Sequence, residues 1–285
     1  MSRTVYVNGE FLPEEAASVS VFDRGFLFAD AVYEVTSVLD GKLIDFDAHL
    51  QRLGRSLREL DMASPCGRDE LLVIHRRLIE ANDLSDGVIY LQVSRGVADR
   101  DFVFPVDATP TLVVFTQSKP NLADSPLSKT GIKVISIPDF RWRRRDIKTV
   151  QLLYPSMGKM MAKAAGADDA WMVEDGVVTE GTANNAYIVT DDGVIVTRQL
   201  GNEILHGITR AAVLRLAAEA QMDIEERPFT IDEAQAAAEA FITSASTFVM
   251  PVIEIDGVAL GNGKPGPVTK RLRQIYLEES RRAAI

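Results

Sequence analysis

Three short segments of the chain contain residues that could do chemistry. They are RWRRRDIKTVQLL at 141–153, VTEGTANN at 178–185 and GITR at 207–210. In the first, Lys148 stands in an apolar stretch that follows a run of arginines. A lysine is usually a solvated surface charge, but burial lowers its pKa and frees the neutral amine to act as a nucleophile or base. Such an amine is what a Schiff-base enzyme requires.

The other two segments contain an acid and a helix start. Glu180 stands in a Thr-Glu-Gly corner between two expected strands, where a carboxylate is ordinarily exposed and idle. Ile208 and Thr209 enter an expected helix, whose free N–H groups could bind a phosphate or could simply form a helix cap. None of the three segments is decisive alone.

The first half of the chain reads as strands with two helices. Asn8-Gly9 and Asp40-Gly41 predict hairpin turns, because both turn positions need positive φ. Leucines at steps of three and four predict a helix after an acidic N-cap at Asp47, and a second helix is expected over about 69–82. Residues 118–130 are rich in proline and serine and are expected to be a linker.

The second half alternates strands and helices. The sequence predicts a helix over about 150–165, further helices from about Thr209, Ile231 and Val268, and turns at Asp175-Gly176 and Asp192-Gly193. The expected strands are IKVISIP, DAWMVE, VVTEG, NAYIVT, VIVTR and AFITS.

Composition excludes several classes of function. The chain has 285 residues, 46% hydrophobic and 25% charged, with a net charge of -10, so nucleic acid and anionic membranes are poor partners. Without an apolar segment at the start or a membrane span, the sequence predicts a cytoplasmic protein. Cys66 is expected to be an inert thiol. The segment GNGKPG at 261–266 is expected to be a surface loop, since too few residues follow it for a dinucleotide-binding βαβ unit. The three histidines are too scattered in sequence to predict a metal site.

In order and content these segments resemble the fold-type IV pyridoxal 5′-phosphate (PLP) enzymes, and among them the D-amino acid aminotransferases most closely. The matching segments are DRGFLFADAVYEV, HLQRL, RWRRRDIKTVQLL, VTEGTANN, NEILHGITR and FITSASTFVMPVIEIDG. The resemblance implies an α/β (α+β) fold with a smaller N-terminal α/β domain over 1–117 and a linker over 118–130. A larger C-terminal PLP-binding domain over 131–285 would be built on a β-barrel-like core with helices. It also implies a homodimer.

The resemblance further implies roles for residues that would bind PLP. Lys148 matches the lysine that forms a Schiff base with the cofactor and moves the substrate proton. Glu180 matches the acid facing the pyridine nitrogen. Arg52 and the Ile208 and Thr209 amides match the phosphate-binding set. Ala245 replaces a threonine common in relatives, so Ser244, Ser246 or backbone N–H groups must bind the phosphate instead.

The substrate residues depart from the pattern of the family. Tyr33 matches a tyrosine on the substrate side of the cofactor, and Arg100 matches an arginine, supplied by the partner subunit, that binds the substrate carboxylate. Phe102 stands where a histidine is expected and cannot donate a hydrogen bond. Carboxylate binding must then depend on Arg100, on Tyr33 or on a loop arginine.

The implied reaction is ping-pong transamination, in which a D-amino acid such as D-alanine donates its amino group and a 2-oxo acid such as 2-oxoglutarate collects it. The alternatives are a branched-chain L-amino acid aminotransferase, an (R)-selective amine transaminase and, less favoured, a 4-amino-4-deoxychorismate lyase. A module that binds PLP or another phosphate without turnover is a rival of another class, against which Lys148 and Glu180 argue.

Overall fold

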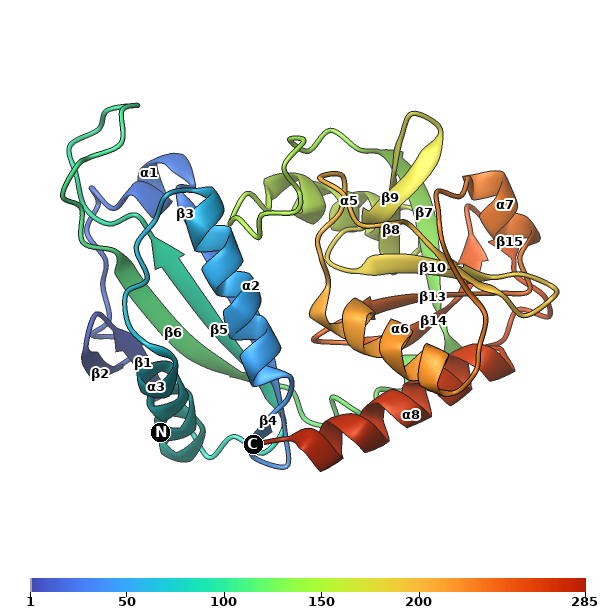
Figure 1. Cartoon of the computed structure of the whole chain (residues 1–285), viewed down its shortest axis with the longest axis horizontal. Coiled ribbons are helices and arrows are strands. Elements are labelled where there is room, and N and C mark those ends of the chain that lie inside the picture. The colour runs from blue at the N-terminus through green and yellow to red at the C-terminus, as the bar shows by residue number, and fades with distance from the viewer. Residues whose placement is uncertain (1) are drawn as a thin grey trace. The chain divides into compact units, whose positions relative to one another are not determined.

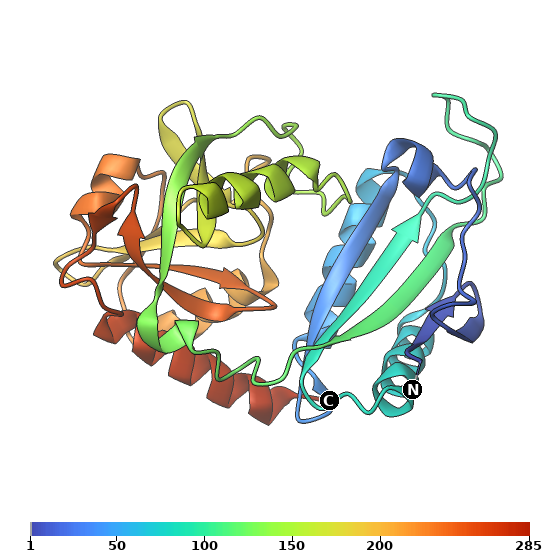
Figure 2. The same cartoon turned by 180° about the vertical axis from the view of Figure 1, so that it is seen from behind.

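The computed structural model describes residues 2–285, which form two compact units (Figures 1 and 2). Unit 1 contains residues up to Leu122 together with Ile147–Gln151 and Ala283–Ile285, and unit 2 contains Ala123–Asp146 and Leu152–Arg282. The sequence predicted contiguous domains, whereas here two segments of the second half belong to the first unit. Ile147–Gln151 does so because its backbone bonds to a strand of unit 1: Lys148 O accepts from Tyr33 N–H at 3.0 Å.

Unit 1 is a six-stranded sheet in the order β2-β1-β6-β5-β3-β4, with two helices on one face. Its strands are β1 (Thr4–Val7), β2 (Glu10–Pro13), β3 (Ala31–Leu39), β4 (Lys42–Leu43), β5 (Gly87–Ser94) and β6 (Thr111–Ser118), and its helices are α1 (Arg24–Phe28), α2 (Phe46–Glu59) and α3 (Arg68–Ala81). Val32, Leu53, Leu78 and Ile89 are among the side chains of its buried core.

Local turn chemistry explains the hairpins of this unit. Asn8 and Gly9 have φ of 47° and 104°, and Asp40 and Gly41 have φ of 52° and 73°, so both predicted turns are confirmed. The predicted cap of α2 was wrong by two residues. The N-cap is Asp45, in the left-handed conformation, and Asp47 lies in the first turn.

Unit 2 is built on a nine-stranded mixed sheet in the order β12-β11-β10-β13-β14-β7-β8-β9, with β15 paired to β14. Its strands are β7 (Ile132–Pro138), β8 (Asp169–Glu174), β9 (Val177–Gly181), β10 (Asn185–Val189), β11 (Ile195–Thr197), β12 (Ile224–Glu226), β13 (Glu239–Ser244), β14 (Phe248–Ile255) and β15 (Val258–Ala259). Its helices are α4 (Leu127–Thr130), α5 (Leu153–Ala164), α6 (Ile208–Glu219), α7 (Ile231–Ala236) and α8 (Pro267–Ala283). The sheet curls around a core that contains Trp171, Ile188 and Phe229, as the expected barrel-like core requires.

Several sequence expectations for unit 2 are refined. α5 begins at Leu153 rather than near Val150, because Val150 N–H donates to Ala31 O at 3.1 Å and extends the segment bonded to β3. α4 lies within the expected linker. Residues 261–266 form a loop between β15 and α8, as predicted. Among the described residues, the helices are all too short or too polar to span a bilayer.

Candidate active site

Lys148 lies in unit 1 with its backbone held on both sides. Its N–H donates to Ser56 Oγ of α2 at 3.2 Å, and its carbonyl accepts from Tyr33 N–H. The side chain is half-buried, and its Nζ is 4.1 Å from the centroid of the Tyr33 ring. The structure therefore brings together two of the residues selected from the sequence, a lysine amine and an aromatic ring.

Tyr33 belongs to an aromatic row on one face of the unit 1 sheet. Its ring stacks on Tyr90 at 5.4 Å between centroids, and Tyr90 stacks on Phe115 at 4.9 Å. All three side chains are half-buried. Since successive residues of a strand point to opposite faces, Tyr33 and its neighbour Glu34 are presented on opposite sides of β3.

Glu34 forms a buried ionic cluster with two residues of α2. Its carboxylate accepts from Arg52 Nε at 2.8 Å and Nη2 at 2.7 Å, and from His49 Nδ1 at 2.7 Å. Burial alone would raise the pKa of Glu34, but Arg52 and His49 lower it from its usual 4.5 to about 2. Arg52, expected at a phosphate, is thus oriented by an acid that sequence reasoning missed.

Replacement of Glu34 by glutamine is expected to lower the free energy of unfolding by about 3–5 kcal/mol at neutral pH, because the buried Arg52 charge loses its partner. A carboxyl whose pKa is lowered in the fold stabilises it above the unfolded pKa and ceases to do so as pH falls. The difference from wild type should therefore shrink between pH 4.5 and about 2.

Urea unfolding across this pH range measures the effect. Glu10→Gln, at an exposed acid of β2, is the matched control and should change stability little. A loss below about 1 kcal/mol for Glu34→Gln at neutral pH, the size of a surface pair, would show that the cluster is not stabilising.

Glu180 lies near the end of β9 in unit 2 and is only 4% exposed, unlike an idle corner carboxylate. Its Oε1 accepts from Arg141 Nη1 at 2.6 Å. Its Oε2 accepts from Leu205 N–H at 3.0 Å and from Asn185 Nδ2 at 3.2 Å. Three donors from separate segments therefore hold this carboxylate in place.

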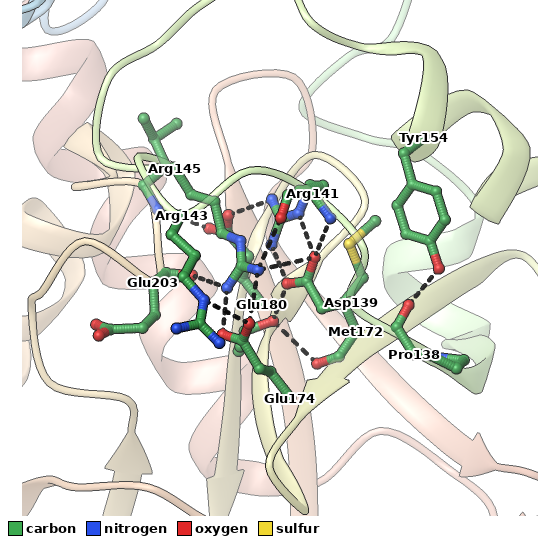
Figure 3. Close-up of polar contacts among 12 residues, drawn as sticks. Pro138, Asp139, Arg141, Arg143, Arg145, Tyr154, Met172, Glu174, Glu180 and Glu203 are labelled. Carbon is green, nitrogen blue, oxygen red and sulfur yellow. Dashed lines mark hydrogen bonds and ion pairs between the residues drawn. The ribbon is translucent and has the colours of Figure 1, made fainter.

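The arginine-rich loop separates into paired and exposed side chains (Figure 3). Arg141 bridges Glu180 and Asp139, while Arg145 pairs with Glu174 at 2.7 Å. Burial opposes ionisation of Arg141, but Glu180 and Asp139 raise the pKa of its guanidinium above the usual value. Arg143, in contrast, is 84% exposed and lies 3.7 Å from Glu174.

The start of α6 packs against Asn185. The N-cap is Gly207, which offers no side-chain acceptor to the amides of the first turn, where Ile208 and Thr209 lie. A Cβ on Gly207 would lie 2.0 Å from Asn185 Oδ1, so only glycine permits this approach. Asn185 also donates to Leu205 O at 3.0 Å. Asn185 therefore connects Glu180 to the start of α6. Neither the residue type nor its position in the sequence had indicated this role.

The turn between β13 and β14 carries the remaining phosphate candidates. Ser244 ends β13, next to Thr243, which is the strand partner of Asn185. Ser244 Oγ lies 2.7 Å from Thr247 Oγ1 and accepts Thr247 N–H at 3.2 Å. Asn185 thus brings Glu180, the start of α6 and the turn after Thr243 together within unit 2, and Ala245 lies in that turn.

Arg100 and Phe102 lie on an exposed loop of unit 1. Arg100 Cζ is 5.3 Å from the Phe28 ring centroid and 5.7 Å from that of Phe102, and the two rings meet edge to face. Phe102 is 78% exposed. The neighbouring arginines Arg24 and Arg95 are instead buried and paired with Asp30.

The structure groups the candidate residues by unit. Unit 1 contains Lys148, Arg52 and the three substrate candidates, and unit 2 contains Glu180, Ile208, Thr209, Ser244 and Ala245. The assignment of Arg52 and the α6 amides to one phosphate stays a prediction. Nothing in the sequence indicated that Glu34, His49 and Asn185 contribute to the site, and it indicated Arg141 only as one of four loop arginines. The buried partners of these residues lie 5 to 39 positions away along the chain.

Comparison with known families decides the assignment of the chain. The model of the amino-transferase class IV family matches residues 31–255, which include β3 and extend through β14. The chain is a class IV aminotransferase. Residues matched by this model include Lys148 and Glu180.

Curated relatives agree with this family. The aminotransferase is 37% identical over 273 residues to the D-alanine aminotransferase of Staphylococcus aureus strain MSSA476, covering 95% of each chain. It is 38% identical over 269 residues to the D-alanine aminotransferase of Bacillus licheniformis, covering 94% of each.

Solved structures agree on the fold. The branched-chain amino acid aminotransferase of Thermoproteus uzoniensis with norvaline superposes with a TM-score of 0.87 at 26% identity, over 98% of this aminotransferase and 94% of that chain. The Escherichia coli branched-chain enzyme gives 0.89 at 23% identity, over 98% and 95%. The expected fold-type IV architecture is therefore confirmed.

Proposed function

We propose that this class IV aminotransferase transfers the amino group of D-amino acids such as D-alanine to 2-oxo acids such as 2-oxoglutarate, with PLP bound to Lys148. The observation that carries the proposal is its identity of 37% with a D-alanine aminotransferase along 95% of both chains. The homology supports the D-amino acid enzymes over the branched-chain alternative, because the two branched-chain structures described above are only 23% and 26% identical to this chain.

The residues present fit PLP. The buried Glu180 carboxylate, oriented by Asn185 and Leu205 N–H, suits a pyridine nitrogen. The start of α6, uncapped by a side chain at Gly207, suits a phosphate. When bound, PLP supplies an electron sink for the bonds at the substrate Cα.

Each residue has a defined task in the proposed reaction. Lys148 Nζ would hold the cofactor and would move a proton at the substrate Cα. Tyr33, whose ring is 4.1 Å from that amine, limits the orientations that the lysine can adopt. The Glu180 carboxylate would stabilise positive charge at the ring nitrogen, and Arg141 and Asn185 keep the carboxylate oriented. The residues that would bind the phosphate are those expected from the sequence: Arg52, the amides of Ile208 and Thr209, and Ser244 or the backbone at Ala245.

Arg100 is the residue that binds the substrate carboxylate in this proposal. Phe28 and Phe102 flank its guanidinium, and an aromatic face attracts a cation without using its N–H donors. Phe102 would thus orient Arg100 rather than donate a hydrogen bond itself.

We also propose that the active form is a homodimer. Exposed apolar side chains occur on both units, including Phe26, Phe102 and Val106 on unit 1 and Leu153 and Met160 on unit 2. Where such side chains form a contiguous area, that area is typical of a subunit contact. The cytoplasmic location stays a prediction from the sequence.

A comparison of three amino donors tests the function. With 2-oxoglutarate as acceptor, D-alanine is expected to react faster than L-leucine or (R)-1-phenylethylamine. A clear preference for either competitor would refute the substrate assignment and favour a branched-chain or an amine transaminase. A colourless protein that does not take up added PLP would refute the enzyme itself.

A further inference from the structure

The turn that follows β13 continues into a strained residue. Phe248, the first residue of β14, has a φ of 58° and a fully buried side chain. Residues other than glycine, asparagine and aspartate rarely adopt this conformation, and a bulky buried aromatic does so only when its surroundings impose it. The turn Ser244–Thr247 therefore needs a contact that holds its end in place.

Arg273 of α8 supplies that contact. Its side chain is buried, and its Nη1 donates to Thr247 O at 2.9 Å and to Val249 O at 2.6 Å, on either side of Phe248. Nη2 donates to Ala123 O at 2.6 Å. A planar guanidinium fixes several acceptors at once, which a lysine ammonium on its flexible stem does less well.

These three acceptors are backbone carbonyls. Their dipoles solvate the guanidinium charge but do not neutralise it, as a carboxylate would. Burial lowers the pKa of Arg273 to about 10, although Asp124 acts in the opposite direction. Burying a cation costs free energy unless hydrogen bonds compensate it, and here the three carbonyls do so. The segment it supports is the turn whose first residue, Ser244, is a phosphate candidate.

The turn lies beside the start of α6. Thr243, just before the turn, pairs with Asn185, and Gly207 approaches Asn185 so closely that a Cβ would lie 2.0 Å from its Oδ1. Two potential anion-binding groups, the α6 amides and the turn, therefore flank the same residue. Ala245 has no hydroxyl to bind a phosphate, unlike the threonine common in relatives. Phosphate binding would therefore depend more on the shape of the turn and on the position of Ser244.

We propose that Arg273 is a positioning residue for the cofactor phosphate, holding the turn 244–247 and the strained Phe248 in the conformation that binds it. The inference rests on the proposed function and adds a residue of α8, outside the matched family region of 31–255. Arg273 acts through the turn and does not itself contact the phosphate.

The experiment compares PLP with pyridoxal, which lacks the phosphate, by titration of the apoprotein. Arg273→Gln is expected to raise the Kd for PLP at least about tenfold, while the Kd for pyridoxal changes by less than about twofold. Arg273→Lys keeps the charge and should recover part of the loss. Arg271→Gln, which removes an exposed charge from the same helix, should leave both constants unchanged.

Each outcome decides between the possible roles. Equal losses for both ligands, or no loss for PLP, would overturn the inference and leave Arg273 a stabilising residue only. If Arg273→Gln does not fold by circular dichroism, Arg273→Lys alone is decisive, with at least about a threefold loss expected for PLP only. A wild-type protein that binds neither ligand would instead refute the proposed function.

Discussion

Replacement of Lys148 by alanine is expected to lower the rate of D-alanine transamination by at least about a thousandfold, since one amine both anchors the cofactor and moves the proton. Its backbone is bonded to Ser56 and Tyr33, so the variant should keep the fold and lose only the amine. The rate of 2-oxo acid formation at saturating donor measures the effect.

A second experiment tests whether Lys148 binds the cofactor covalently. Borohydride reduction of the PLP-loaded wild type should attach the cofactor to the peptide containing Lys148, as detected by mass spectrometry, and the variant should show no such adduct there. Lys129→Ala, at an exposed lysine of α4, is the control and should retain the activity. An alanine variant with more than a tenth of the wild-type rate would contradict the role of Lys148.

Replacement of Glu180 by glutamine is expected to slow the reaction by at least about a hundredfold, the size of effect seen when one preorganised electrostatic contact is lost. Glutamine has nearly the same shape and can still accept from Leu205 N–H, but it has no negative charge to hold a proton on the ring nitrogen. The rate should fall far more than the affinity for PLP, because the phosphate contacts remain.

Glu174→Gln is the matched control, because Glu174 also pairs with an arginine of the same loop, Arg145. Arg145 lies 3.5 Å from Asp139 as well, so it keeps an acid partner in that variant. Equal rate losses in the two variants would indicate that the ionic network of the loop matters, rather than the charge at position 180.

The buried ionic groups show where sequence reasoning reached its limit. Arg52 was selected by resemblance, but its contact with Glu34 depends on α2 packing on β3, and nothing local indicates it. Asn185 likewise meets Glu180 and Gly207 only because three segments converge. Arg273 is a plain helix residue in the sequence, and its three carbonyl partners lie 24 to 150 positions away.

The sequence by itself determined the features whose causes are local. Positive-φ turns at Asn8-Gly9 and Asp40-Gly41 and the amphipathic period of α2 follow from backbone sterics and apolar spacing within a few residues. Family resemblance added the roles expected of Lys148 and Glu180, and both residues lie within the region that the class IV family model matches.

Only the tertiary structure decided which neighbours surround these groups. It placed Lys148 beside Tyr33 in unit 1 and buried Glu180 among Arg141, Asn185 and Leu205 N–H. The physical reason is that burial and charge pairing depend on sheet order and helix packing, which join residues far apart in the chain. The free energy of such contacts is set by desolvation and geometry, and neither is encoded in the spacing of residues along the sequence.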